Sequence, residues 1–417
     1  MSDFVPTAAH LNRTPGERDA TQPQETAKRD INAQRNHHCE SRRGGNGRGG
    51  LVPVLTQRQL NRTTLQRQLL LRRSGKSAIE AVEHLVGMQA QAPSPPYFGL
   101  WTRLTTFQPD DLAQRLLDRS VVRIVLMRGT VHLVSAEDCL LLRPMVQSLL
   151  DRGVRSNTQH RSELVGLDED ELTAVGRKLL DEQPRSAAQL RPLLAERWPD
   201  RSPAALAFAV RNLLPLVQIP PRAIWGRSGQ PVYATAETWL GRPLADSTPV
   251  AEVLRRYLAA FGPATVADMQ TWSGLRGLKD VVRGMDLRGF RDEDGRELVD
   301  LPDAELADPE LPSPPRFLPP FDNLLLSHHD RSRVMSPEDR KRLFSVKNAV
   351  LPGTILVDGF LHGTWQITRK RDAATLHITA YRALPDVEAL AEEGRRLLAF
   401  AEPDGVEQSV NIVVDAE

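Results

Sequence analysis

Hydrophobic residues recur at helical spacing as soon as the polar start of the chain ends. In residues 54–71 the leucines at positions 60, 65, 69 and 70 follow a helical pattern among polar side chains. The stretch SAIEAVEHLVGM begins with Ser77, a residue type that caps helices, and repeats apolar residues through Met88. QPDDLAQRLLDR indicates a third helix that begins near Asp110. Residues 54–119 are therefore predicted to be mainly helical.

A strand pattern follows these helices and then recurs. In SVVRIVLMRGTVHLV, β-branched runs on either side of Arg128 and Gly129 predict a strand, a turn and a strand. Helices followed by a two-stranded ribbon are typical of a winged helix. The same order recurs in residues 186–235, where GRSGQP separates the strand-like runs AIW and VYAT, and in residues 249–301, where a Gly-Pro break divides the helices. We expect three winged-helix units in tandem.

The last part of the chain changes character. After a proline-punctuated stretch, GTILVDGFLHGTWQIT and TLHITAYRAL alternate apolar with polar residues, as antiparallel strands do, and DVEALAEEGRRLLAF predicts a final helix. The fold class we expect is α+β, mainly α, with a C-terminal β-rich, partial-barrel element. The predicted bounds are 54–165, 166–247 and 248–310 for the winged-helix units, and 311–417 for the β-rich domain.

The segment 1–53 differs from the rest in composition. It is rich in Arg, Asn, Gln, Thr and Gly, ends in SRRGGNGRGG and has almost no large apolar side chain. Such a composition predicts a disordered polar tail. It is either an RGG-like arm that binds nucleic acid or a non-essential extension, with translation starting near Val52 or Val54.

Composition sets further limits on the class of protein. The chain has 417 residues, 40% of them hydrophobic, and a formal net charge of +1, which suits a globular protein of several domains. Its sequence has neither a membrane-spanning apolar run nor a secretory leader pattern, so we expect a cytoplasmic protein. The two cysteines, Cys39 and Cys139, predict neither a disulfide framework nor a cysteine zinc site. Arginine far outnumbers lysine, so a polyanion site would be a local patch.

No role in folding is evident for Gln89 and Gln91. They lie at the end of an apolar run, immediately before prolines. Pro93 disfavours the helical conformation at Ala92, so the chain is expected to be extended there and both amides can point to one side. A glutamine amide does not take up a proton at neutral pH, but it can orient a water molecule. An oriented water is sufficient for hydrolysis only when the leaving group is good, as an alkylated, cationic purine is. The alternative is that both amides cap helix carbonyls.

Four stretches carry a resemblance to a known family. VLTQRQLNRTTLQRQLLL, VGMQAQAPSPPYFGLWTRL, MRGTVHLV and LPPFDNLLLSHHDR together resemble the AlkZ-type winged-helix DNA glycosylases, from Val54 to the C-terminus. The resemblance implies tandem winged-helix motifs around a channel, a C-terminal barrel-like element and a Gln, apolar, Gln catalytic motif, here Gln89, Ala90 and Gln91. It implies a monofunctional glycosylase that removes N7-alkylated purines and, in some members, unhooks interstrand crosslinks. The small Ala90 is a mild departure that affects packing.

Several other polar residues are candidates for contact with DNA. Arg128 lies at a predicted hairpin tip, where it would meet a phosphate, and His132 follows on the returning strand. The hairpin between Val357 and Trp365, with the tip DGFLHG, would insert at the DNA. The remaining candidates are Asp322, His328, His329 and Arg331 in FDNLLLSHHDR, and His362 near the end of that hairpin. For each of them the alternative is an ordinary structural role in a strand, loop or exposed turn.

The function we expect is hydrolysis of the N-glycosidic bond of N7-alkylated purines in double-stranded DNA by a monomer without metal or organic cofactor. His328 and His329 point to opposite sides of an extended chain, which disfavours a shared metal. SGKSAIE lacks the upstream glycine and strand of a phosphate-binding loop, so Ser77 is expected to cap a helix. Two alternatives stay open: a winged-helix DNA-binding protein or transcription regulator without catalysis, and a metal-dependent hydrolase that uses the His328 region.

Overall fold

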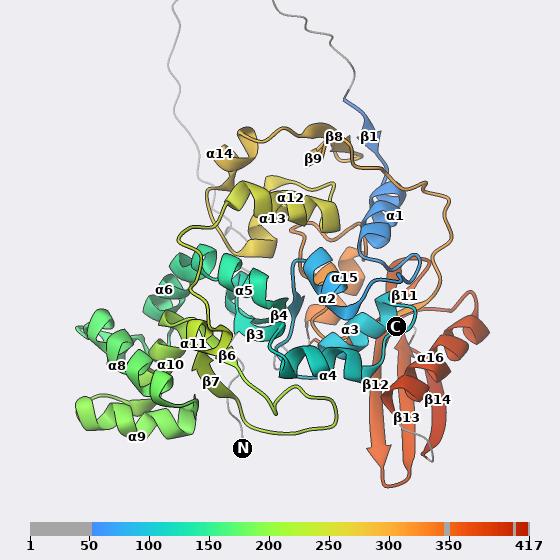
Figure 1. Ribbon diagram of the computed structural model, residues 1–417. Helices are drawn as coiled ribbons and strands as arrows, with labels where there is room; N and C mark the ends of the chain where they lie inside the picture. The colour runs from blue at the N-terminus through green and yellow to red at the C-terminus, as the bar shows by residue number, and fades with distance from the viewer. Residues whose placement is uncertain (1–51, 346–350, 403–405, 416–417) are drawn as a thin grey trace, which may run out of the picture.

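The computed structural model describes residues 52–345, 351–402 and 406–415, in which helices and strands alternate along the chain (Figure 1). The mixture of helices and strands agrees with the predicted α+β class. The tail predicted for residues 1–53 lies outside the described residues, apart from Val52 and Pro53. Within the described ranges, no helix has the length and apolar character that crossing a membrane requires.

The central sheet has six strands and contains the glutamine motif at one edge. Its strand order is β2-β4-β3-β6-β7-β5, and every neighbouring pair is antiparallel. Strands of the first and second predicted winged-helix units thus share one sheet.

The elements up to the end of the second unit are β1 (Val54–Leu55), α1 (Gln57–Arg67), α2 (Ala78–His84), β2 (Met88–Gln89), α3 (Pro95–Arg103), α4 (Pro109–Leu117), β3 (Val121–Val125), η1 (Met127–Gly129), β4 (Val131–Ser135), α5 (Ala136–Leu142), η2 (Pro144–Val146), α6 (Gln147–Ser156), α7 (Arg161–Leu164), α8 (Glu169–Glu182), β5 (Arg185–Ser186), α9 (Ala187–Arg197), α10 (Pro203–Leu213), β6 (Leu216–Gln218), β7 (Val232–Thr235) and α11 (Ala236–Leu240).

The predicted hairpin around Arg128 is confirmed. β3 and β4 pair in antiparallel register, and the turn between them has positive φ angles at Arg128 (59°) and Gly129 (71°). The predicted strand at AIW is wrong. Ala223 lies in a turn with φ of 74°, accepts a hydrogen bond from the Tyr97 hydroxyl at 2.7 Å, and is followed by Trp225, whose ring packs 4.9 Å from that of Tyr97. This segment folds onto α3 and does not join the sheet.

The helix that precedes the glutamines is shorter than its pattern predicts. It begins as expected, with a capping box between Ser77 and Glu80, but ends at His84 and not at Met88. Val86 and Gly87 have φ angles of 53° and 89°, which reverse the chain into β2. A Cβ at Gly87 would come within 2.7 Å of a methyl group of Val134, so only glycine fits this turn.

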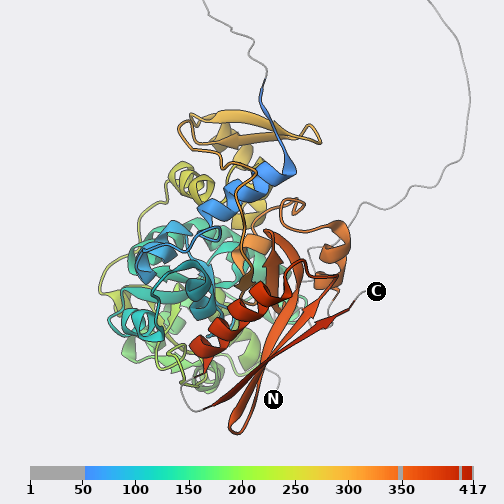
Figure 2. The ribbon, with the colours of Figure 1, turned by 90° about the vertical axis from the view of Figure 1, so that its right-hand side faces the viewer.

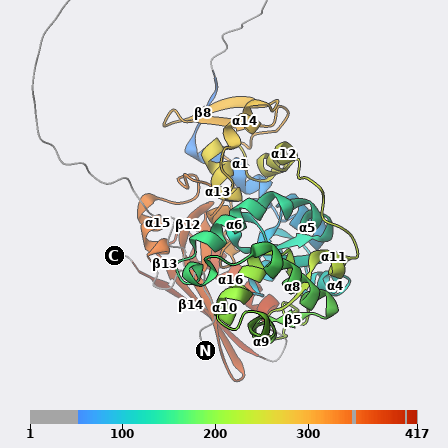
Figure 3. The ribbon, with the colours of Figure 1, turned by 90° about the vertical axis from the view of Figure 1, so that its left-hand side faces the viewer.

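The sheet is buried on both faces, because side chains alternate between them along each strand. One face, with Val122, Ile124 and Val134, packs in the cluster that includes Tyr257 and Trp272. The opposite face packs in a second apolar cluster, in which Met88, Ala90, Val121, Val131, Leu133 and Tyr97 lie together. α8, α9 and α10 pack together beside β5, the strand at the other edge of this sheet (Figure 3). The glutamine motif is thus held by a rigid edge strand.

The third helical segment lies against the start of the folded chain. Its elements are α12 (Val250–Phe261), α13 (Val266–Ser273), α14 (Leu278–Arg283), β8 (Arg288–Asp292) and β9 (Glu297–Asp300). The order of helix, break, two helices and hairpin is as predicted. β1 pairs in parallel with β8, and α1 lies beside α12 (Figure 1). The winged-helix assignments and their bounds stay predictions, since the sheets join strands across them.

The C-terminal segment is β-rich, as predicted. Its elements are β10 (Arg316–Leu318), η3 (Asn323–Leu325), α15 (Pro337–Phe344), β11 (Gly353–Val357), β12 (Phe360–Lys370), β13 (Ala373–Ala380), α16 (Val387–Ala401) and β14 (Glu407–Val414). The five strands pair in the linear order β10 to β14, antiparallel except for β13 and β14. β14 is absent from the sequence prediction. It can pair in parallel because α16 carries the chain back across the sheet (Figure 2).

Candidate active site

Gln89 lies at the exposed edge of the central sheet but is itself nearly covered. It is the last residue of β2, directly opposite His132 of β4, and its side chain is 8% exposed. The Arg128 guanidinium donates through Nη2 to Gln89 Oε1 at 2.7 Å. The amide is therefore held in one orientation, with its NH2 group free of partners among the described residues.

Gln91 is fixed by a different donor. Ala90 continues the ladder, because its N–H donates to the Val131 carbonyl at 2.7 Å, and Gln91 Oε1 then accepts from the Val131 N–H at 3.1 Å. The side chain of Gln91 is partly exposed. The chain is thus in a strand at Gln89 and bends from Gln91 onward, so an extended backbone is confirmed only for the first glutamine. The helix-cap alternative is wrong, since α2 already ends at His84 and neither glutamine NH2 group donates to a helix carbonyl among the described residues.

Arg128 joins three parts of the chain at the site. Besides Gln89, its Nη2 donates to Asn323 Oδ1 at 3.0 Å and lies 3.5 Å from His132 Nε2, while Nη1 donates to the Trp272 carbonyl at 2.8 Å. Burial, together with the charge of Arg331, lowers the pKa of Arg128 to about 10, so it stays protonated at neutral pH. Arg128 is partly exposed, and its guanidinium is held by protein groups, so a phosphate contact stays a prediction.

His132 is a neutral group behind the glutamine. Its side chain is fully buried, Nδ1 lies 3.0 Å from the Thr130 carbonyl, and Nε2 faces Arg128. Burial and the charge of Arg128 lower the pKa of His132 to about 3. It is therefore a neutral ring packed beside Arg128, and its burial keeps it from the DNA contact that the sequence suggested.

Asp322 belongs to a buried ion pair. Its two carboxylate oxygens accept from Arg103 at 2.8 and 2.9 Å, and one of them also caps the Leu324 N–H at 2.9 Å. Both side chains are 2% exposed, so Asp322 does not face a substrate. Its neighbour Asn323 does reach the site, because Nδ2 donates to the Gly87 carbonyl at 3.2 Å while Oδ1 accepts from Arg128. Sequence reasoning missed Asn323, although it lies within the stretch FDNLLLSHHDR.

A narrow crevice opens beside Gln89. Its volume is about 10 Å³, which is room for about one water molecule. Its walls are Gln68, Leu85, Gly87, Met88, Gln89, Pro95, Pro96, Arg103, Pro319, Phe321, Asp322 and Asn323. The polar groups that converge on this space are amides and an ion pair, without a histidine or a free carboxylate.

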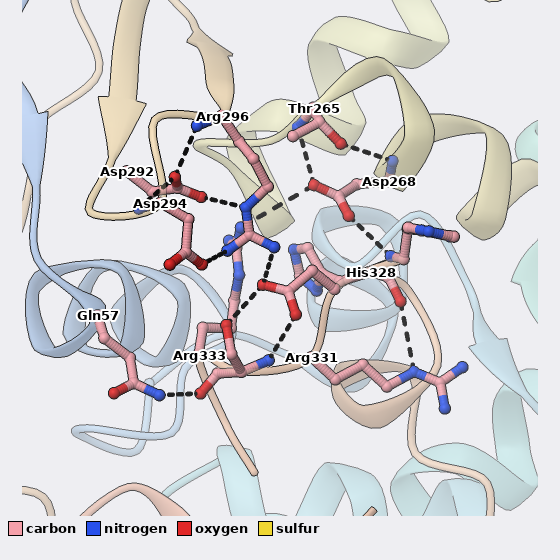
Figure 4. A network of polar contacts seen from close by, with 12 residues as sticks. Gln57, Thr265, Asp268, Asp292, Asp294, Arg296, His328, Arg331 and Arg333 are labelled. Atoms are coloured by element: carbon pink, nitrogen blue, oxygen red, sulfur yellow. Dashed lines mark hydrogen bonds and ion pairs between the residues drawn. The ribbon is translucent and has the colours of Figure 1, made fainter. Parts of the chain in front are cut away.

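The residues 328–331 form a network apart from the glutamines (Figure 4). His328 is 1% exposed, with Nε2 at 3.0 Å from the Phe261 carbonyl, and burial lowers its pKa to about 3. Arg331 is 7% exposed, donates to the His328 carbonyl at 3.3 Å and lies over the Phe344 ring at 4.6 Å. Only His329 has an exposed side chain, and its N–H donates to Asp268 at 2.7 Å. These contacts make His328 and Arg331 interior groups.

The predicted inserting hairpin is also wrong. Its turn consists of Asp358 and Gly359 and packs on α1, where Arg58 donates to Asp358 at 2.7 Å and Asn61 donates to the Gly359 carbonyl at 2.8 Å. His362 lies within β12, is 8% exposed, and has Nε2 at 3.0 Å from the Ala383 carbonyl. Gly359 is buried against the first helix and Asp358, although half exposed, is held by Arg58, so the tip does not project freely toward DNA.

The described part of the chain holds no group of three or more His, Cys, Asp or Glu side chains arranged for a metal ion. Cys139 lies in the core with a pKa that burial raises to about 12. The polar groups gathered around Gln89 are the amide of Asn323 and the guanidinium of Arg128.

Comparisons with known proteins agree on one family. The family model described as DNA glycosylase AlkZ-like matches residues 82–400. A protein of Streptomyces sahachiroi named interstrand DNA cross-link repair glycosylase is 25% identical over 353 residues, which is 80% of this chain and 92% of that protein. The solved structure of Streptomyces sahachiroi DNA glycosylase AlkZ superposes with a TM-score of 0.71 at 21% identity, over 86% of this chain and 100% of the other. The chain belongs to the AlkZ-like DNA glycosylase family.

Proposed function

We propose that this protein is a monofunctional DNA glycosylase that hydrolyses the N-glycosidic bond of N7-alkylated purines in duplex DNA, including purines tethered in interstrand crosslinks. Family membership supports glycosylase activity, and a relative is named for repair of interstrand crosslinks. Gln89 and Gln91 are the groups to which we assign the positioning of water.

One observation carries the proposal: each amide oxygen of the motif is fixed by one donor, Arg128 for Gln89 and the Val131 N–H for Gln91. A carbonyl oxygen has two lone pairs, so each keeps one to accept from a water, and each NH2 can donate. The crevice beside Gln89 has room for about one water. The site can orient a nucleophile although it holds no general base.

The substrate must then supply most of the reactivity. In an N7-alkylated deoxyguanosine the base carries a positive charge. The C1′–N9 bond breaks with its electron pair going to N9, which neutralises the base, and the oriented water forms a bond to C1′ and releases a proton to solvent. An abasic site remains. A positioned water and favourable electrostatics are sufficient for so good a leaving group.

The size of the crevice supports an open site. Many glycosylases rotate the damaged base into a pocket, but a crosslinked base is tethered to both strands and cannot leave the duplex freely. A space of about 10 Å³ accommodates a water and not a purine. We therefore assign the base to the outside of the crevice, where bulky adducts fit.

The surface beyond the crevice offers phosphate contacts. Arg152 and Arg276 are exposed and line a hollow of about 430 Å³ between α6 and the turn after α13. Neither has an ion-pair partner in the described ranges. We assign them to the DNA backbone, which makes binding strongly dependent on salt.

The proposal is tested by incubating the protein with methylated duplex DNA and measuring free 7-methylguanine. Strand cleavage should appear only after alkali or heat, because a monofunctional enzyme leaves the sugar intact. A second duplex with an N7-linked crosslink should become separable under denaturing conditions. A DNA-binding protein without catalysis would instead release no base from either substrate and would prefer one binding sequence.

A further inference from the structure

A buried arginine lies directly behind the glutamine motif. Arg123 is in the middle of β3, is 1% exposed and pairs across the ladder with Leu133 of β4, which in turn lies opposite Met88 of β2. Directly opposite residues share a face of a sheet. The Arg123 side chain is thus on the apolar face, whereas Gln89 and His132 are on the other.

The surroundings of this guanidinium are mostly apolar, with one polar side chain opposite it: Gln218 of β6 is its partner across the ladder, and Gln218 Oε1 has no hydrogen-bond donor among the described residues. The cluster on its face contains Met88, Ala90, Val121, Val131 and Leu133. Among the described residues, Arg123 has no ion-pair partner, and neither Nε nor Nη1 has a hydrogen-bond acceptor. Burial, together with the positive charge of Arg222, lowers the pKa of Arg123 to about 10.

Its one hydrogen bond reaches the middle of the motif. Arg123 Nη2 donates to the Ala90 carbonyl at 2.7 Å. That carbonyl belongs to the peptide unit that links Ala90 to Gln91, while the preceding unit is fixed by the Ala90 N–H to the Val131 carbonyl at 2.7 Å. Because peptide units are planar, these two bonds set the direction in which the chain carries Gln91 away from Gln89.

This arrangement is poorly explained by stability. A buried cation without a carboxylate partner loses its hydration and gains little in return, and apolar residues of similar volume often replace buried charged groups at no loss of stability. A methionine would suit this cluster. A costly group that contacts the centre of a catalytic motif is better explained by function than by folding.

We propose that Arg123 is a positioning residue for the Gln-Ala-Gln motif: by holding the Ala90 carbonyl it fixes the peptide unit from which Gln91 extends, and so sets the position of Gln91 relative to Gln89. It does not touch the DNA. This role rests on the glycosylase function proposed above. It also gives the small middle residue a purpose, since Ala90 leaves space for the guanidinium beneath the strand.

The test compares R123M with R123K and with R143M as a matched control. Arg143 is also a buried arginine, 2% exposed, but holds the carbonyls of Asn212 and Leu214, away from the motif. Single-turnover release of 7-methylguanine, the Kd for DNA and the melting temperature are measured for each. R123M should keep or raise the melting temperature, bind DNA as tightly as the parent and lose about 100-fold in rate, as small misplacements of catalytic groups do.

The lysine variant should recover part of that rate, because it can still donate to Ala90. R143M should melt earlier, because it removes three hydrogen bonds, to Gln147, Asn212 and Leu214, whereas R123M removes one. The rate of its folded fraction should be unchanged. Three results would overturn the role of Arg123: a full rate in R123M, a rate loss explained by unfolding, or no gain with lysine. If the parent chain itself releases no base, the proposed function fails and the role of Arg123 fails with it.

Discussion

Arg128 donates to Gln89 Oε1 at 2.7 Å and, through the same nitrogen, to Asn323 Oδ1 at 3.0 Å. The two acceptors come from opposite ends of the folded chain, a strand in its first quarter and a short helix in its C-terminal segment. The amide of Gln89 is therefore oriented by contacts that form only when the whole chain is folded. Such preorganisation is what a site that lacks a general base requires.

R128Q distinguishes a positioning role from a phosphate contact. Glutamine keeps much of the length but loses the charge and the second donor nitrogen, so Gln89 should lose its fixed orientation. We expect the single-turnover rate to fall by about 100-fold, with little change in the Kd for DNA. A phosphate contact predicts the opposite, namely weaker binding and a slope of log K against log salt that is smaller by about 1. R276Q, at an exposed arginine, is the control that should show this second pattern.

Base release should be insensitive to pH around neutrality. The titrating groups in contact with Gln89 are His132, with a pKa of about 3, and Arg128, with a pKa of about 10. Neither changes its charge between about pH 5 and pH 9. The single-turnover rate on methylated DNA, corrected for spontaneous depurination, should be flat across this range. A break near pH 6 to 7 would contradict the account, because it would reveal a general acid or base.

The buried pair between Asp322 and Arg103 should matter for stability. D322N keeps the shape of the side chain but leaves the Arg103 guanidinium buried beside a neutral amide. Removing one partner of a buried ion pair costs about 3 to 5 kcal/mol in the free energy of unfolding. D280N, at an ion pair with side chains 67% and 83% exposed, should change it by less than about 1 kcal/mol. Urea unfolding measures the free energy of unfolding of both variants. Equal losses in D322N and D280N would show that the buried pair contributes no more to stability than the exposed pair.

Stability should also fall as the solution becomes acidic. His132 and His328 have folded-state pKa values of about 3, below the roughly 6.5 of an unfolded histidine, so the unfolded chain binds their protons first. Their contribution is complete above about pH 6.5 and is lost as pH falls toward 3, by about 1.4 kcal/mol per pH unit for each histidine. Urea unfolding at pH 7, 6 and 5 should show the decline. In H132Q the free energy of unfolding should fall less steeply as pH is lowered, because one of the two histidines no longer contributes. An unchanged dependence on pH in that variant would refute the burial of His132.

Local patterns in the sequence predicted local structure well. The hairpin around Arg128, the capping box at Ser77 and the extended chain at Gln89 all depend on neighbouring residues, and the structure has each of them. The early end of α2 was missed because Val86 takes a positive φ that its residue type does not suggest. Gly87 was the available signal, since it lies where the chain must reverse against Val134.

The polar partners of the site were less predictable, because they depend on contacts between distant segments. Arg128 and Asp322 looked like exposed groups, yet each is turned inward by a partner far along the chain, Gln89 and Arg103 respectively. For the same reason Asn323 and Arg123 were not singled out. A charged residue in the middle of an apolar strand pattern, as Arg123 is in VVRIV, was the one local signal for a buried functional group.

The central claim is that two amides position the water, and single-turnover release of 7-methylguanine by Q89A and Q91A tests it most directly. Q147A is the matched control, because Gln147 is also partly exposed and hydrogen-bonded by an arginine, at 2.6 Å from Arg143, but lies on α6. Circular dichroism and DNA binding should confirm that all the variants fold and bind. The account predicts that Q89A and Q91A each lose most of the activity of the parent while Q147A keeps it. Release at the parental rate by either Q89A or Q91A would contradict it.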